Sequence, residues 1–132
     1  MAISIVRLGS PRTAQEGLRI GTVRRPPRGV PKSEYAKRDF YDVWLPNLAP
    51  SHNLLTAAKA ALDQKSWAIF ERKFRSEMNA PDAAKILDLL AALSYSANFS
   101  VGCYCSDENR CHRSILRRLL IERGATINGA PR

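Results

Sequence analysis

The sequence predicts a small α/β domain, and three features of the 132-residue chain indicate it. Short runs rich in β-branched residues lie near the beginning, and stretches with helical periodicity fill the middle. A strand-like run followed by an amphipathic stretch lies near the end. We therefore expect a single domain over residues 1–132, with a mixed or partly parallel sheet and about four helices packed on both of its faces.

Two strands are expected in the first quarter of the chain. Residues 3–8 combine apolar and β-branched side chains and end at Gly9-Ser10-Pro11, a turn-forming tripeptide. Residues 18–23 alternate, which places Leu18, Ile20 and Thr22 on one face of a strand. Residues 33–48 are rich in aromatic side chains but are interrupted by Pro46, so we expect a short helical turn on each side of an irregular segment.

The middle of the chain predicts three helices. Ser51 is a suitable N-cap for the first, whose apolar side chains continue to Leu62. Ser66 is the expected N-cap of the second, in which aromatic residues and Met78 form an apolar stripe. Pro81 stands at the preferred first position of the third.

The segment 99–124 combines a strand, a short acidic turn and a helix. We expect strand 99–105 to be central in the sheet and the last helix to run from about 109 to 123, with Asn109 or Asp107 as its N-cap. Gly124 suits the left-handed position that ends many helices. The tail 125–132 could form a short strand or fray. The segment also contains all three cysteines and one of the two histidines, which makes it the candidate site.

The positive charge is concentrated toward the two ends of the chain. The formal net charge is +9, with nine basic against three acidic side chains in residues 1–40 and six against three in residues 101–132. The proline-rich loop 24–32 contains four cations and no acid. If the two ends pack side by side, they form a positive face suited to a phosphate-bearing ligand or nucleic acid. The alternative is a solvated surface without a dedicated partner.

The sequence also sets expectations about compartment and partners. Three cysteines do not make a disulfide framework, so reduced thiols and a cytoplasmic location are expected. There is no apolar run of roughly 20 residues and no signal-peptide pattern at the start, so we expect no membrane association. Neither a cofactor nor an oligomeric state is indicated.

The favoured interpretation is an anion site between loop 24–32 and the N-terminus of the last helix. Free amides and the positive end of the dipole make a helix start a common place for anions. Helical spacing places Arg110, Ser114, Arg117 and Arg118 toward solvent, with the Cys111 and His112 stripes facing the core. The expected ligand-binding residues are Arg24, Arg25, Arg28, Arg110, Arg113 and Ser114.

Three alternatives remain open for the cysteines. In the first, Cys105 or Cys111 is the nucleophile of a thiol enzyme for sulfur transfer or redox chemistry, with His112 as base or orienting group. The acidic residues at 107 and 108 argue against this, because carboxylates repel an oxyanion.

In the second alternative, a metal is bound by ligands drawn from Cys103, Cys105, Cys111 and His112. Thiols two residues apart on a strand are about 6 to 7 Å apart, and neighbours on a helix diverge by about 100°, which disfavours such a site. In the third, the cysteines, Cys103 above all, are buried and inert, and the arginines only solubilise the surface.

The sequence resembles the family catalogued as domain of unknown function 488, whose members include the YeaO-like proteins. The resemblance covers nearly the whole chain and depends on the Pro-Arg-Gly ending of residues 24–29, Trp44-Leu45, the segment 67–78, and Cys105-x5-Cys111-His112-Arg113-Ser114. It implies a small bacterial α/β domain in which the Cys-His-Arg-Ser segment matters. The family name assigns no activity.

Overall fold

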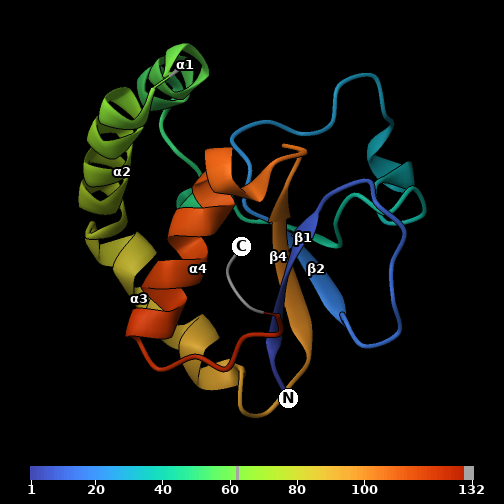
Figure 1. Ribbon diagram of the computed structural model, residues 1–132. Coiled ribbons are helices and arrows are strands. Elements are labelled where there is room, and N and C mark those ends of the chain that lie inside the picture. Colours follow the sequence, from blue (N-terminus) through green and yellow to red (C-terminus); the bar gives the residue numbers. More distant parts are fainter. Residues whose placement is uncertain (62, 130–132) are drawn as a thin grey trace.

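The computed structural model describes residues 1–61 and 63–129 and is built around one four-stranded sheet (Figure 1). The strands are β1 (Ile3–Arg7), β2 (Leu18–Gly21), β3 (Val43–Trp44) and β4 (Phe99–Cys103). Their order in the sheet is β1-β4-β2-β3, and every pairing between them is parallel. The α/β prediction is confirmed, with β4 in an interior position as expected. The sheet is parallel throughout rather than mixed.

Four α-helices pack with this sheet: α1 (His52–Ala60), α2 (Gln64–Met78), α3 (Pro81–Leu93) and α4 (His112–Glu122). The three middle helices confirm the periodicity of the sequence. The hydroxyl oxygen of Ser51 accepts a hydrogen bond from the Leu54 amide, as expected of an N-cap. Leu62, assigned from the sequence to the first helix, lies outside the described residues.

Two predicted helix starts are wrong. The carboxylate of Asp63, not Ser66, caps α2 and accepts from the Ser66 amide at 2.7 Å. Residues 108–110 form a separate 3₁₀ turn capped by Asp107, so α4 begins at His112 with Cys111 as its N-cap. Each aspartate accepts a hydrogen bond from the amide two or three residues later. The sequence alone did not show which of these capped turns would continue into an α-helix.

The helices cover only one face of the sheet, contrary to the expectation that they cover both (Figure 1). The larger hydrophobic cluster joins residues of all four helices to strand residues such as Ile3, Ile20 and Val101. A smaller cluster, which includes Leu8 and Tyr41, is covered by the irregular segment 35–41. That segment is rich in aromatic residues, and it can therefore exclude water without forming a helix.

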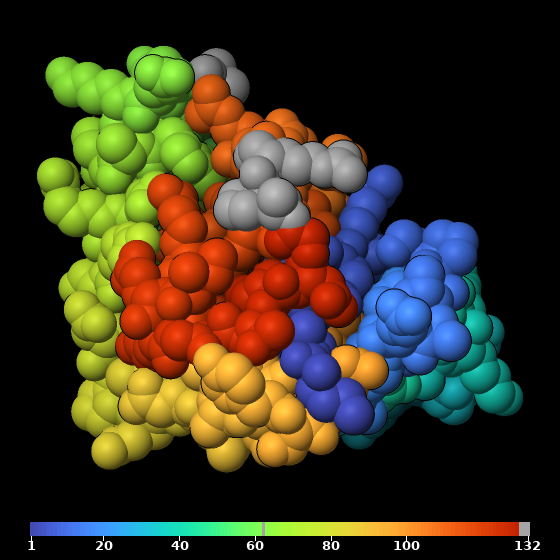
Figure 2. Space-filling view, turned by 60° about the horizontal axis from the view of Figure 1, so that its bottom comes forward, coloured from blue at the N-terminus to red at the C-terminus, as the bar shows by residue number. Residues whose placement is uncertain are grey.

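The segment after α4 returns to the first strand. The Ile3 amide donates to the Thr126 carbonyl at 2.9 Å, the Asn128 amide donates to the Ile3 carbonyl at 2.8 Å, and Ile127 makes a parallel bridge with Ile3. Figure 2 shows this red segment lying against the dark-blue N-terminal strand. The predicted tail strand is thus reduced to one bridge, and residues 130–132 lie outside the described part of the chain.

A search of the described residues for a helix long and apolar enough to cross a membrane finds none.

Candidate functional site

A pocket of about 670 Å³ opens at the carboxyl ends of the central strands. One wall is formed by the segment 23–28, a second by the first turns of α1, and the floor by residues 103–105 and His112. Pockets at this edge of a parallel sheet are common, because the strands end there and the chain turns away on both sides. The structure therefore brings the basic loop and the first residue of α4 to one cavity, as the sequence interpretation required.

The basic loop is held in place by hydrogen bonds at two points. The guanidinium of Arg24 donates to the carbonyl oxygens of Pro50 and Ala49, each at 2.9 Å. The hydroxyl of Tyr104 donates to the Arg25 carbonyl at 2.9 Å. Pro26 and Pro27 restrict the backbone directly after these points, so this part of the loop loses little conformational entropy when a ligand binds.

Several cationic or imidazole side chains face the pocket without a carboxylate beside them. Arg25, Arg28, Lys59 and His52 line it together with Arg24, and no Asp or Glu is among its described lining residues. A nitrogen of the Arg25 guanidinium lies 3.3 Å from Nδ1 of His52. Arg28 and Lys59 make no side-chain hydrogen bond within the described part of the chain. These two cations are therefore available to an anionic ligand.

The three cysteines occupy two different environments. Strand β4 ends at Cys103, which is buried, and the chain then turns, so that Cys105 is an exposed free thiol on the pocket wall. The sequence predicted a strand over residues 99–105 that contains both cysteines, but β4 ends at Cys103 and residue 105 lies beyond it.

Cys103, Cys111 and His112 form a buried cluster, with one potential ligand atom from each residue and all three atoms within 4.8 Å of one another. The sulfur atoms of Cys103 and Cys111 lie at bonding distance, as in a disulfide, and the Cα atoms of the two residues are 7.9 Å apart. Cys111 has φ −132° and ψ 149°, which is extended rather than helical. For this reason its side chain converges with that of His112, whereas two neighbours within a helix would diverge.

His112 has a defined tautomer. Its Nε2 lies 2.6 Å from the Thr22 carbonyl oxygen, and a carbonyl can only accept, so Nε2 carries the proton. Nδ1 then faces Sγ of Cys111 at 3.8 Å. Burial lowers the pKa of His112 to about 4, although the hydrogen bond to Thr22 opposes the shift. The imidazole is therefore neutral at pH 7.

The carbonyl that orients His112 is itself held by the central strand. The amide and the hydroxyl of Thr22 both donate to the Gly102 carbonyl at 3.0 Å. Thr22 directly follows β2, which pairs with β4 in parallel. The position of the imidazole is thus determined by the register of the sheet.

The remaining predicted residues do not line the pocket. Arg113 is buried, and its Nη2 donates to the Cys105 carbonyl at 2.7 Å. Ser114 donates to the Cys111 carbonyl at 2.9 Å. The Arg110 guanidinium is exposed and lies 6.0 Å from the ring centroid of Trp67. Arg113 and Ser114 thus hold the β4–α4 connection, whereas Arg110 lies against α2.

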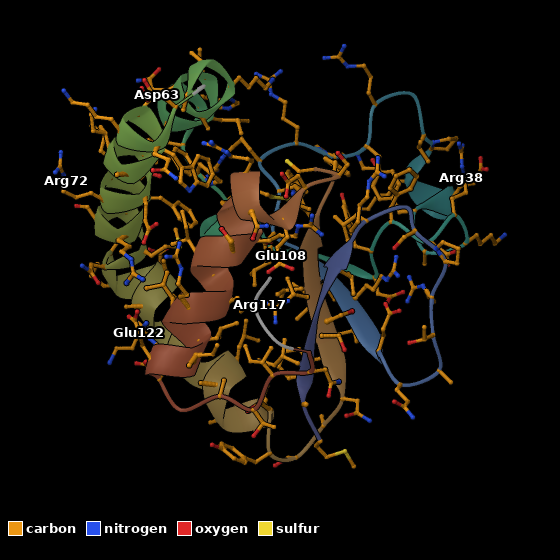
Figure 3. All side chains as sticks on the ribbon, in the orientation of Figure 1. Arg38, Asp63, Arg72, Glu108, Arg117 and Glu122 are labelled. Atoms are coloured by element: carbon orange, nitrogen blue, oxygen red, sulfur yellow. A yellow bond between two sulfur atoms is a disulfide. The ribbon has the colours of Figure 1, made fainter. Side chains whose placement is uncertain are left out.

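Arg117 was expected on the solvent side of the last helix and is buried instead. Its guanidinium donates to both carboxylate oxygens of Glu108, at 2.6 and 2.9 Å, and Figure 3 shows the two side chains pointing toward one another. The carbonyl of Gly129 accepts a further bond at 3.2 Å. The acidic turn and the returning tail cover this helix face, and helical spacing contains no information about either.

The sequence interpretation missed three residues of this region, because His52, Lys59 and Tyr104 line the pocket. It considered Cys103 and Cys105 together as ligands, and the structure brings only Cys103 to Cys111 and His112. The Cys-x7-Cys-His spacing from Cys103 to His112 was the available signal for this choice. No comparable signal existed for Lys59, because a lysine on an amphipathic helix is usually only a solvated residue.

The comparison with family models finds one match that covers most of the chain. The model of DUF488-N3a, described as the active DUF488-N3 subclade, matches residues 3–124. Its range contains the basic loop, the pocket and the cysteine and histidine cluster. No curated protein and no solved structure matches the chain.

Proposed function

This chain belongs to the DUF488-N3a family, and we propose that it binds a phosphate-bearing ligand of about nucleotide size between the basic loop and the start of α4. The observation that carries the proposal is the pocket wall, where Arg28 and Lys59 stand without a carboxylate partner among the described residues. Charge-assisted hydrogen bonds to phosphate oxygens are about twice as strong as neutral ones.

Size and composition favour a mononucleotide over an extended strand. A volume of about 670 Å³ falls within the range of small-molecule sites, roughly 300 to 1,000 Å³. Phe40 and Tyr104 both line the pocket, with ring centroids 6.3 Å apart. Their faces and edges offer an apolar surface to a base, while the cations meet the phosphate.

The two cations make separate contributions that mutagenesis can measure. We expect wild type to bind nucleoside phosphates, and Arg28→Ala or Lys59→Ala to weaken binding about tenfold, since a hydrogen bond to a charged group contributes about 1.5 to 3 kcal/mol. The measurement is isothermal titration calorimetry at two salt concentrations. Added salt should also weaken binding, because cations on the protein and phosphates on the ligand are screened.

The matched control is Arg72→Ala. Arg72 is an exposed arginine that Figure 3 shows on the outer side of α2, away from the pocket. Its removal changes the net charge by the same amount as Arg28→Ala and should leave the affinity unchanged. Equal losses in the two variants would mean that only net charge matters, and an absence of any nucleotide binding by wild type would refute the proposal.

A second candidate function is thiol chemistry at Cys105, and its exposure on the pocket wall favours it. The thiolate is the reactive form, so a catalytic cysteine reacts with alkylating agents well below the ordinary thiol pKa of roughly 8.5. The expected result is rapid alkylation of Cys105 at pH 7, measured by mass spectrometry against a Cys105→Ser control. A rate that rises only near pH 8.5 would eliminate this candidate.

A further inference from the structure

We propose that Cys103, Cys111 and His112 are the three protein ligands of a zinc ion at the base of the pocket. This site differs from the metal site considered from sequence, because Cys105 is not among its ligands. It also goes beyond anion binding, since it requires none of the pocket's cations.

The distance between the imidazole nitrogen and the nearer sulfur suits tetrahedral coordination. Zinc bonds of about 2.3 Å to sulfur and about 2.0 to 2.1 Å to nitrogen place a thiolate and an imidazole nitrogen about 3.5 Å apart. Sγ of Cys111 and Nδ1 of His112 are 3.8 Å apart, and Sγ of Cys103 completes a triangle in which no side exceeds 4.8 Å. The two sulfur atoms lie at bonding distance, so they would have to move apart, by rotation of the cysteine side chains, to share an ion with Nδ1.

The backbone spacing of the two cysteines is wider than a disulfide prefers. Their Cα atoms are 7.9 Å apart, whereas disulfides usually span about 4.4 to 6.8 Å. A zinc ion between two sulfur atoms replaces one bond of about 2.05 Å with two of about 2.3 Å, and therefore lengthens the reach. Cys103 ends a central strand and Cys111 caps α4, so neither backbone can move freely.

The imidazole is already oriented as a metal ligand. Metal-binding histidines usually donate their other ring N–H to a carbonyl or carboxylate, which fixes the tautomer and the ring. Nε2 of His112 donates to the Thr22 carbonyl at 2.6 Å, and this leaves the lone pair of Nδ1 directed toward the cysteines.

Charge balance is compatible with the burial of all three residues. Two thiolates and a neutral imidazole around Zn²⁺ have no net charge, so the ion does not bring an uncompensated charge into the interior. Soft thiolate ligands with one imidazole favour zinc over Mg²⁺ or Ca²⁺, which prefer oxygen ligands. Cys103 and His112 also line the pocket, so the fourth coordination position is available from that side.

The experiment measures metal and thiols in protein purified without reductant from zinc-supplemented cells. We expect about one zinc per chain by elemental mass spectrometry, and three titratable thiols after unfolding with a chelator. In Cys103→Ser, Cys111→Ser and His112→Asn, zinc content should fall at least about tenfold. Cys105→Ser, which changes the cysteine outside the cluster, should keep its zinc.

A second measurement does not depend on whether these variants fold. Cobalt-substituted wild type should show a thiolate-to-cobalt charge-transfer band and the strong visible bands of tetrahedral coordination. Zinc-free protein with three thiols, a disulfide that leaves only one thiol, or equal zinc loss in Cys105→Ser would each overturn the proposal. Arg28→Ala should retain zinc whatever its effect on nucleotide binding, so the two proposals fail independently.

Discussion

At the scale of single residues, the most constrained side chain of the fold is Arg19 on β2. It is fully buried, and Nε donates to the Glu16 carboxylate at 2.9 Å. Nη1 donates to the carbonyls of Ser10 and Asp39 at 2.8 and 2.6 Å. One guanidinium thus joins the turn after β1 to the turn before β3. It thereby fixes the irregular segment 35–41 to the folded core.

Replacing Arg19 should therefore be costly. We expect Arg19→Met to lower the free energy of unfolding by about 3 to 5 kcal/mol, since it leaves the buried Glu16 carboxylate without its partner. Urea denaturation measures this loss. The control Arg123→Met removes an ion pair to the exposed Asp88 and should cost no more than about 1 kcal/mol. Similar costs for both variants would contradict the structural role of Arg19.

Close backbone approach also constrains single positions. A Cβ at Gly21 would lie 2.3 Å from Cδ2 of the buried Tyr41 ring. A Cβ at Gly102 would lie 2.6 Å from the Val6 carbonyl oxygen. These two glycines are paired across β2 and β4, next to the strand ends that carry the pocket. The absence of a side chain allows the Tyr41 ring to pack on Gly21 and β1 to pack on Gly102.

At the scale of elements, the β4–α4 connection determines which groups can act. The strand stops at Cys103, the 3₁₀ turn spans residues 108–110, and the helix does not start until His112. The turn is anchored by the bidentate Glu108–Arg117 pair, and the Arg113 guanidinium holds the Cys105 carbonyl. Arg113, one of the arginines expected to bind phosphate, thus also helps to position the segment that carries Cys105.

The basic loop and α1 form the other side of the site as one unit. The N-cap of α1 is fixed, because the Ser51 amide and hydroxyl both donate to the Glu77 carboxylate, at 2.9 and 2.6 Å. A ligand in the pocket would meet side chains of the loop and the first turns of α1. This arrangement makes Arg28 and Lys59 the decisive positions for the binding experiment.

At the scale of the whole molecule, stability depends on pairings between the two ends of the chain. Strand β1 pairs with β4, whose residues come 96 positions later, and Ile3 also contacts the returning tail at Ile127. The central strand is thus enclosed by segments from the first fifth of the sequence. Such non-local pairing must overcome a large loop-closure entropy before it becomes favourable.

The pH dependence of stability follows from two acidic residues, Glu16 and Asp42, that accept hydrogen bonds from Arg19. Burial raises the pKa of Glu16, but the Thr13 amide and the Arg19 guanidinium lower it more, so its pKa falls below the ordinary 4.5. Burial likewise opposes the shift at Asp42, where Arg12 and the Arg19 amide lower the pKa below 3.8. Each of the two carboxylates binds its proton more tightly in the unfolded chain than in the folded one. The free energy of unfolding therefore rises with pH between the folded-state and the unfolded-state pKa values.

We therefore expect the contribution of both acids to be complete above about pH 5.5 and to be lost as pH falls through their folded-state pKa values. Urea midpoints between pH 6 and pH 3 measure the effect. The Asp42→Asn variant should show a smaller decrease over the same interval. Midpoints that stay constant between pH 5 and pH 3 would contradict the assignment.

The sequence alone determined the elements whose signals are local. Apolar periodicity and the Ser51 and Pro81 starts predicted the middle helices, and β-branched runs predicted β1, β2 and β4. The prolines and cations of residues 24–32 predicted a stiff basic loop, part of which lines the pocket. These features depend on neighbours within a few positions, which is the distance over which propensity and capping act.

Only the tertiary structure decided which residues meet. It buried Arg113 and Arg117, exposed Cys105, and brought Cys103 to Cys111 and His112. These outcomes depend on where a strand stops and on what a distant segment covers, and neither is encoded in side-chain spacing. The physical reason is that burial and ligand geometry arise from packing between segments far apart in the chain, whereas periodicity describes one segment at a time.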